Sequence, residues 1–215
     1  MSKILEFIFN IFFGTLRNAM RIKGWYLNKY RNQVQAEINP YTSCAAHAGT
    51  FWLQNINHEY FSDYTPDMYS KEINSKEYLT WTRKNLKNGA WIAAKYKGNL
   101  NQVWLIQAKF LSDKIWASGI TDKEVIFNDT TNLEIIKNAL DRSPVIINMS
   151  PIYKGIKLGH VVLVVDYKEY VFTIDDSFGN PGNNYADGHI GHGDDVKLSE
   201  SYFEKVKGSF SIYLN

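Results

Sequence analysis

The hydrophobic and polar positions divide the chain into a first part with helical patterns and a second part with short apolar runs. The helical patterns cover residues 3–21, 44–56, 75–88, 101–112 and 131–140. The apolar runs, which predict strands, cover residues 145–149, 158–167, 170–176 and 209–214. Helices that precede a mostly antiparallel sheet are typical of an α+β fold.

The run at 158–167 predicts the central strand of the sheet, because it is apolar on both faces. A tight turn at Lys168-Glu169 would lead into residues 170–176 as its antiparallel partner. Residues 177–197 are rich in Gly, Asn and Asp, which indicates a long loop.

Capping and breaking residues set the expected helix ends. Pro40 stops any preceding helix, and Thr42 or Ser43 can cap a helix that begins at Cys44. Residues 131–134 (Thr-Asn-Leu-Glu) form a capping box in which the threonine is the cap. One face of the helix at 44–56 carries residues that would let it approach a sheet closely: Ala45, Ala48, Gly49 and Trp52.

The N-terminus predicts a helical extension, residues 1–30, ahead of a single domain at 31–215. Its apolar stretch at 4–13 is too short to span a bilayer, and no A-x-A cleavage site follows it. A helix docked on the domain is the favoured interpretation, with an interfacial anchor and a signal peptide as alternatives. We expect cytoplasmic synthesis without a clear signal peptide, which is compatible with later release or association with a virion.

Composition excludes some classes of function. The net charge is +2 and no run of five or six like charges occurs, so the chain lacks the electrostatic footprint of a nucleic-acid binder. A single cysteine excludes an internal disulfide and suits a reducing compartment. Aromatic residues make up 15% of the chain, which suits a packed core or a groove that stacks on a substrate.

That single cysteine, Cys44, stands where the sequence predicts a helix to begin. Only the thiolate form attacks a carbonyl, and the N–H groups at a helix N-terminus lower the pKa of a thiol. His160 opens the predicted central strand, from which it could complete an ion pair with the thiolate. Either residue alone is more often structural, but the two in this order make a candidate nucleophile and base.

The residues around this pair resemble a known family. Gln35 and the segment 39–44 (Asn-Pro-Tyr-Thr-Ser-Cys) precede a small-residue helix, Gly159-His160 opens a valine-rich strand, and Asp-Ser-Phe-Gly follows at 176–179. The pattern resembles papain-fold cysteine peptidases related to the double-glycine-leader (bacteriocin-processing) peptidases. It covers residues 33–56 and 158–180. The chain departs from the family after the cysteine, where Ala-Ala-His replaces Gly-Pro-Thr.

The resemblance implies a papain-like fold and a role for each matching residue. Cys44 would be the nucleophile, and His160 the general base and then the acid for the leaving amine. Asp176 would hold the imidazole in the correct tautomer. Gln35 would supply a side-chain N–H to the oxyanion hole, with the backbone N–H of Cys44 as the second donor.

Some of these assignments have competitors. A two-residue turn at 168–169 would place Asp175, not Asp176, on the face of His160, whereas a three-residue turn or one bulge would reverse that. The family's turn pattern favours Asp176. Gln33 competes with Gln35 for the oxyanion hole. His47 lies one helical turn after the cysteine, where its access to the sulfur as a base would be poor.

The loop segment 187–195 has the residue types of metal ligands, His and Asp, but no known metal-site spacing. A solvated loop is the favoured interpretation, so we expect neither a metal nor a cofactor.

We therefore expect a hydrolase that cleaves a peptide, protein or peptidoglycan amide bond through an acyl-thioester, of phage or bacterial type. We expect no nucleic-acid partner and no strong membrane signal beyond the N-terminal stretch. Two alternatives stay open: a catalytically idle papain-fold binding or inhibitory protein, and a transglutaminase-like acyltransferase with the same triad.

Overall fold

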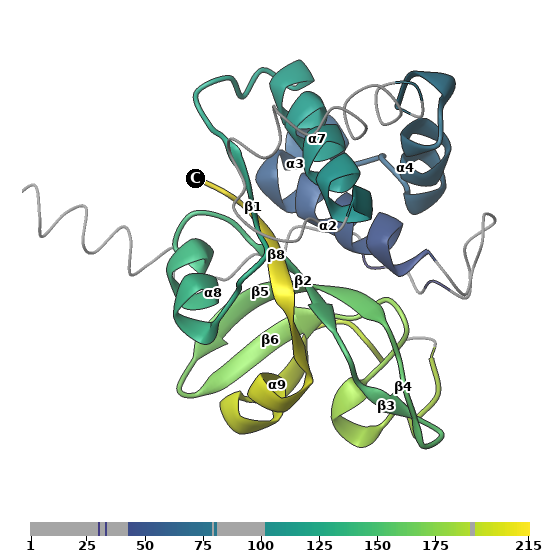
Figure 1. Cartoon of the computed structure of the whole chain (residues 1–215), viewed down its shortest axis with the longest axis vertical. Coiled ribbons are helices and arrows are strands. Elements are labelled where there is room, and N and C mark those ends of the chain that lie inside the picture. Colours follow the sequence, from purple (N-terminus) through teal and green to yellow (C-terminus); the bar gives the residue numbers. More distant parts are fainter. Residues whose placement is uncertain (1–29, 31–32, 34–42, 79, 81–101, 190–191) are drawn as a thin grey trace, which may run out of the picture.

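A computed structural model of the chain describes residues 30, 33, 43–78, 80, 102–189 and 192–215 (Figure 1). The predicted helix at 3–21 and the domain boundary near residue 30 lie outside the described residues. The predicted helix at 75–88 lies mostly outside them, although residues 76–78 and 80 are helical.

Four helices form one group beside the sheet (Figure 1). They are α2 (Cys44–Ile56), α3 (His58–Phe61), α4 (Pro66–Ile73) and α7 (Gln102–Ala117). The bounds of α2 match the sequence prediction, and α7 runs five residues beyond its predicted end at 112. The sequence pattern gave no indication of α3 and α4, which begin after the side-chain caps Asn57 and Thr65.

The main sheet has six strands, and every paired neighbour is antiparallel. In spatial order they are β1 (Val125–Asn128), β8 (Lys207–Leu214), β2 (Val145–Met149), β5 (His160–Lys168), β6 (Val171–Asp175) and β7 (Val196–Ser199). The α+β arrangement and the interior position of β5 are as predicted. β1 and β7 were not predicted.

Smaller elements complete the second part of the chain. They are the hairpin β3 (Ile152–Tyr153) and β4 (Ile156–Lys157), the 3₁₀ turn η2 (Pro181–Asn183), and the helices α8 (Leu133–Leu140) and α9 (Glu200–Val206). The predicted cap of α8 is wrong by one residue. Asn132 accepts from the backbone N–H of Ile135, while the hydroxyl of Thr131 donates to Ser211 instead.

Both faces of the sheet are buried, because β5 contributes to a core on each side. Val161, Leu163 and Val165 pack against the group of α2, α3, α4 and α7 (the α2 group), while Val162 and Val164 pack against α8 and α9. This alternation within one strand explains why the run at 158–167 contains apolar residues at consecutive positions.

The face of α2 that the sequence predicted to approach the sheet contacts two different neighbours. Trp52 is fully buried and its Nε1 donates to the carbonyl of Pro144, 2.9 Å away, just before β2. Gly49, which the sequence placed on the sheet-facing side, instead faces α4. A Cβ added there would lie 2.5 Å from Cε2 of Tyr69, so the glycine makes room for that ring.

Among the described residues, no helix combines the length and the apolar character needed to cross a membrane.

Gly49→Ala is expected to destabilise the protein, because Tyr69 is fully buried and its hydroxyl bonds to Gln107. Overpacking costs about 1–3 kcal/mol, partly offset by a helix propensity gain of about 1 kcal/mol for alanine. Urea unfolding should therefore show a net loss on the order of 1 kcal/mol. Gly159→Ala is the control, since no heavy atom lies within 4 Å of its added Cβ. Equal stability of the two variants would contradict the packing described.

Candidate active site

The register of the β5–β6 hairpin decides which aspartate meets His160. Lys168 pairs with Val171, so the turn residues are Glu169 and Tyr170, one position later than predicted. Both have positive φ angles, of 50° and 64°, as type I′ hairpin turns require. This turn by itself would still place Asp175 on the face of His160.

A β-bulge in β5 changes which aspartate lies on the same face as His160. The pairing shifts between Val164 and Asp166, which leaves Val165 as the additional residue in β5. Beyond the bulge Leu163 pairs with Asp175, so His160 shares its face with Asp176.

His160 and Asp176 form a buried pair. Nε2 of the imidazole lies 2.6 Å from Oδ1 of the carboxylate, and the two side chains are 4% and 0% exposed. Since Nε2 is engaged by Asp176, Nδ1 is the ring nitrogen left to face the thiol. Asp175 makes a different contact, in which its Oδ1 accepts from the backbone N–H of Asp195 at 3.1 Å.

Three donors hold the carboxylate of Asp176. Besides His160, the backbone N–H of Phe178 donates to Oδ1 at 2.8 Å, and the hydroxyl of Tyr185 donates to Oδ2 at 3.0 Å. The backbone of Asp176 is held by hydrogen bonds as well. Its N–H donates to the carbonyl of Gly193 at 2.8 Å, and its carbonyl accepts from the hydroxyl of Tyr30 at 2.9 Å. The buried charge is thus matched by hydrogen bonds on both oxygens.

Cys44 is the first residue of α2 and meets the first residue of β5. Its thiol lies next to the His160 ring, and both that ring and the backbone N–H of Val161 act to lower the pKa of the thiol. Ser43, predicted as a possible cap, makes no side-chain capping bond. The thiol is therefore an acceptor at a helix N-terminus where N–H groups are available.

The electrostatics favour a thiolate paired with an imidazolium. Burial by itself raises the pKa of the Cys44 thiol, but the hydrogen bond and positive charge of His160, with the Val161 N–H, outweigh it and hold the pKa below its usual value. Burial also opposes the imidazolium, but the charge and hydrogen bond of Asp176 and the contact with Cys44 raise the pKa of His160.

Gln33 is the described glutamine near this site. Its backbone N–H donates to the carbonyl of Ser177 at 2.7 Å, and its Oε1 accepts from the Ser177 hydroxyl at 2.8 Å. Gln33 is 2% exposed, and both hydrogen bonds connect it to Ser177, the residue that follows Asp176. Gln35, the favoured candidate from the sequence, lies outside the described residues.

The contacts of His47 do not suit it as a base for Cys44. It is 1% exposed, and its Nδ1 lies 3.0 Å from the carbonyl of Ser43, which also accepts from its backbone N–H.

Among the described residues, one group of neighbouring carboxylates joins the end of β6 to the loop that follows it. Ligand atoms of Asp175, Asp194 and Asp195 lie within 4.8 Å of one another, and the last two residues are exposed. His189 is not part of this group, because its Nδ1 lies 2.7 Å from the carbonyl of Phe178. Exposed carboxylates at such spacing are common without a metal, and no other observation points to an ion here.

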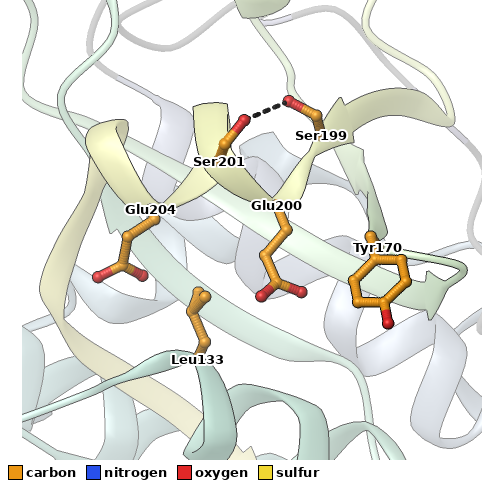
Figure 2. A pocket seen from close by; sticks show the side chains of 6 residues that line it. All are labelled: Leu133, Tyr170, Ser199, Glu200, Ser201 and Glu204. Carbon is orange, nitrogen blue, oxygen red and sulfur yellow. Dashed lines mark hydrogen bonds between the residues drawn. The ribbon is translucent and has the colours of Figure 1, made fainter.

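A hollow lies elsewhere, where the β5–β6 turn and the end of β7 meet the starts of α8 and α9 (Figure 2). None of the residues discussed for catalysis takes part in it. Its lining residues are Leu133, Tyr170, Ser199, Glu200, Ser201 and Glu204.

Sequence reasoning missed several residues that support the site, among them Tyr30, Val161, Tyr185 and Gly193. Val161 acts through its backbone, and no side-chain pattern reveals that. A Cβ on Gly193 would lie 1.8 Å from the carbonyl oxygen of Asp176, so only glycine fits there. The glycine-rich loop pattern was the one available signal, and it does not single out a position.

No protein-family model and no curated protein matches the chain. A double-glycine-motif protease from an AMS/PCAT transporter, solved in complex with the leader peptide, is 11% identical, with 89% of this chain and 94% of that chain covered and a TM-score of 0.43. The peptidase domain of Streptococcus ComA, a bifunctional ABC transporter involved in quorum sensing, is 15% identical, with 78% and 89% covered and a TM-score of 0.37.

Both are double-glycine-type peptidase domains, the group that the sequence motifs resemble. At TM-scores below 0.5 the likeness carries no argument about this chain, whose function has to be argued from its own residues.

The ion pair predicts how the thiol titrates. Because His160 and not His47 stabilises the thiolate, His160→Gln should raise the pKa of Cys44 towards or above the usual value for a thiol, since the Val161 N–H is then left to oppose the effect of burial without the imidazolium. His47→Gln should leave it low. The ultraviolet absorbance of the thiolate, followed against pH, measures both, and Cys44 is the only cysteine that contributes. A thiol pKa unchanged by His160→Gln would contradict the pairing.

Proposed function

We propose that this protein is a papain-like cysteine peptidase in which Cys44, His160 and Asp176 form the catalytic triad. The observation that carries the proposal is the buried 2.6 Å pair of His160 Nε2 and Asp176 Oδ1, with the Cys44 thiol next to the same imidazole ring, which lowers the pKa of the thiol. A thiol at a helix N-terminus, a base and an orienting acid in this order are the parts of nucleophilic acyl transfer.

The proposed reaction has two halves. The Cys44 thiolate attacks the carbonyl carbon of the scissile amide, and the tetrahedral intermediate collapses when His160 gives its proton to the leaving amine. An acyl-thioester stays on Cys44. His160, now neutral, removes a proton from water, whose oxygen attacks the thioester to release the acid and return the thiolate. Asp176 keeps Nε2 protonated, so Nδ1 is the nitrogen that exchanges protons.

The oxyanion of the intermediate needs at least two donors. The backbone N–H of Cys44 is one of them. For the other we propose a glutamine side chain from the segment before α2, either Gln33 or Gln35. The Ser177 hydroxyl donates to the oxygen of the Gln33 amide, and no described residue accepts from its N–H₂ group, which favours Gln33 as the donor to substrate.

For the substrate we propose a peptide or protein amide. Peptidoglycan, the other substrate that the sequence left open, presents amide bonds of the same chemical type. Acyl transfer to an amine uses the same first half-reaction and differs only in what attacks the thioester.

The function is tested by incubating the full chain with a proteome-derived peptide library and, separately, with purified peptidoglycan. Mass spectrometry of newly formed termini is the readout, with a primary amine added in a parallel reaction. Cys44→Ala should abolish cleavage, and His160→Ala should lower kcat/KM by at least about 10²–10⁴. Asp176→Asn should retain more activity than Asp176→Ala, because an amide oxygen still accepts from Nε2.

The other outcomes separate the alternatives. New amide adducts with the added amine would identify an acyltransferase. An absence of cleavage, together with no labelling of Cys44 by an epoxide probe at neutral pH, would contradict the proposal and favour an idle binding protein.

The two glutamines are separated by Gln33→Ala and Gln35→Ala, each matched to the other as control. The variant that removes an oxyanion donor should lose about 10²–10³ in kcat. The rate of Cys44 alkylation should change little, because displacement of a halide forms no oxyanion. A large kcat loss in Gln35→Ala with none in Gln33→Ala would overturn the preference for Gln33.

A further inference from the structure

Tyr185 contacts the carboxylate oxygen of Asp176 that the triad does not use. Its hydroxyl lies 3.0 Å from Oδ2, while Oδ1 is occupied by Nε2 of His160 and the N–H of Phe178. Tyr185 is 3% exposed, so no water replaces this bond without a rearrangement of the loop. The two oxygens of the carboxylate are thus held from different directions.

The backbone at Tyr185 is in a conformation that bulky residues rarely adopt. Its φ is 61°, and the preceding Asn184 has a φ of 57°. Such conformations persist where the surrounding structure over-determines them, and they concentrate at functional sites. Here the turn η2 and a hydrogen bond from the Tyr185 N–H to the Asn180 carbonyl, at 2.9 Å, hold the residue in place.

Aromatic neighbours fix the ring as well. Ring centroids of Phe178, Tyr153 and His189 lie 5.1, 5.9 and 6.3 Å from that of Tyr185. The phenol therefore reaches Asp176 from a ring with little freedom to rotate away, which is the arrangement expected of a preorganised donor.

We propose that Tyr185 is a positioning residue for the triad, whose hydroxyl locks the Asp176 carboxylate in the orientation that presents Oδ1 to His160. This inference rests on the proposed function. Without the phenol, the carboxylate keeps its two contacts at Oδ1 but turns more easily about its Cβ–Cγ bond, because no other described donor bonds to Oδ2. The imidazolium then loses part of the charge that stabilises it.

The phenol can act in this way throughout the working pH range. Burial raises the pKa of Tyr185 and the charge of Asp176 raises it further, so the hydroxyl stays protonated and remains a donor.

Titratable groups approach Asp176 from four other parts of the fold. They are Cys44 on α2, His160 on β5, Tyr202 on α9 and Tyr30 before α2. Tyr202 provides a matched control, because its hydroxyl donates to the carbonyl of Pro181 at 2.5 Å and not to the carboxylate. Tyr185→Phe and Tyr202→Phe each remove one hydroxyl bond from the same loop region, a buried one at Tyr185 and a half-buried one at Tyr202.

The test is the rate at which iodoacetamide alkylates Cys44 in the full chain, measured against pH by intact mass. The sulfur displaces iodide, and as the only cysteine it reports this site alone. A thiolate–imidazolium pair gives two steps, one where the thiol ionises and an alkaline one where His160 loses its proton. Tyr185→Phe should move the alkaline step down by about one pH unit, equivalent to a tenfold change in the equilibrium. Tyr202→Phe should leave it in place.

A double-mutant cycle separates positioning from general loop packing. In an Asp176→Asn background the phenol has no carboxylate to orient, so Tyr185→Phe should cause no further shift of the alkaline step. An alkaline step that is unmoved or raised in Tyr185→Phe, or the same shift in both backgrounds, would overturn the inference.

Folding of each variant is checked by thermal unfolding. Should Tyr185→Phe not fold, 3-fluorotyrosine placed at position 185 keeps the ring and hydroxyl but makes the phenol a stronger donor. An alkaline step that moves would support the role, and one that does not move would overturn it.

A wild-type profile with one ordinary thiol titration would overturn the proposed function together with this inference. A two-step wild-type profile with no response at position 185 would overturn the inference alone.

Discussion

The hydrogen bond between Nε2 of His160 and Oδ1 of Asp176 is the interaction on which the site depends. Both groups are almost completely buried, and a buried charge is costly unless it is paired and hydrogen-bonded. The pair raises the pKa of the imidazole, and the imidazolium in turn holds the pKa of the Cys44 thiol below its usual value. The low thiol pKa is thus a consequence of a carboxylate that does not touch the sulfur.

The sheet makes this geometry rigid. β5 is packed on both faces, by the α2 group on one side and by α8 and α9 on the other, so the start of the strand is fixed relative to α2. The bulge at Val165 changes which aspartate faces the histidine without breaking either core. A single additional residue in one strand therefore decides which aspartate shares a face with His160.

Remote segments supply the remaining contacts around Asp176. Tyr30 comes from before α2, Tyr185 from the turn after η2, and Gly193 from further along the same loop. Each contributes through a hydrogen bond or a close backbone approach. The loop that the sequence presented as a candidate metal-binding segment therefore contributes mainly by surrounding the carboxylate.

The sequence by itself determined the α+β class, the start of α2 at Cys44 and the interior position of β5. These follow from local signals, namely a proline, a run of small residues and apolar positions on both faces of a strand. It also selected Cys44, His160 and Asp176, which the structure brings together, although it left Asp175 open. Only the tertiary structure decided between the aspartates, because the bulge depends on packing across two sheet faces. The same holds for Tyr185 and Gly193, whose contacts with Asp176 join positions with no shared pattern in the sequence.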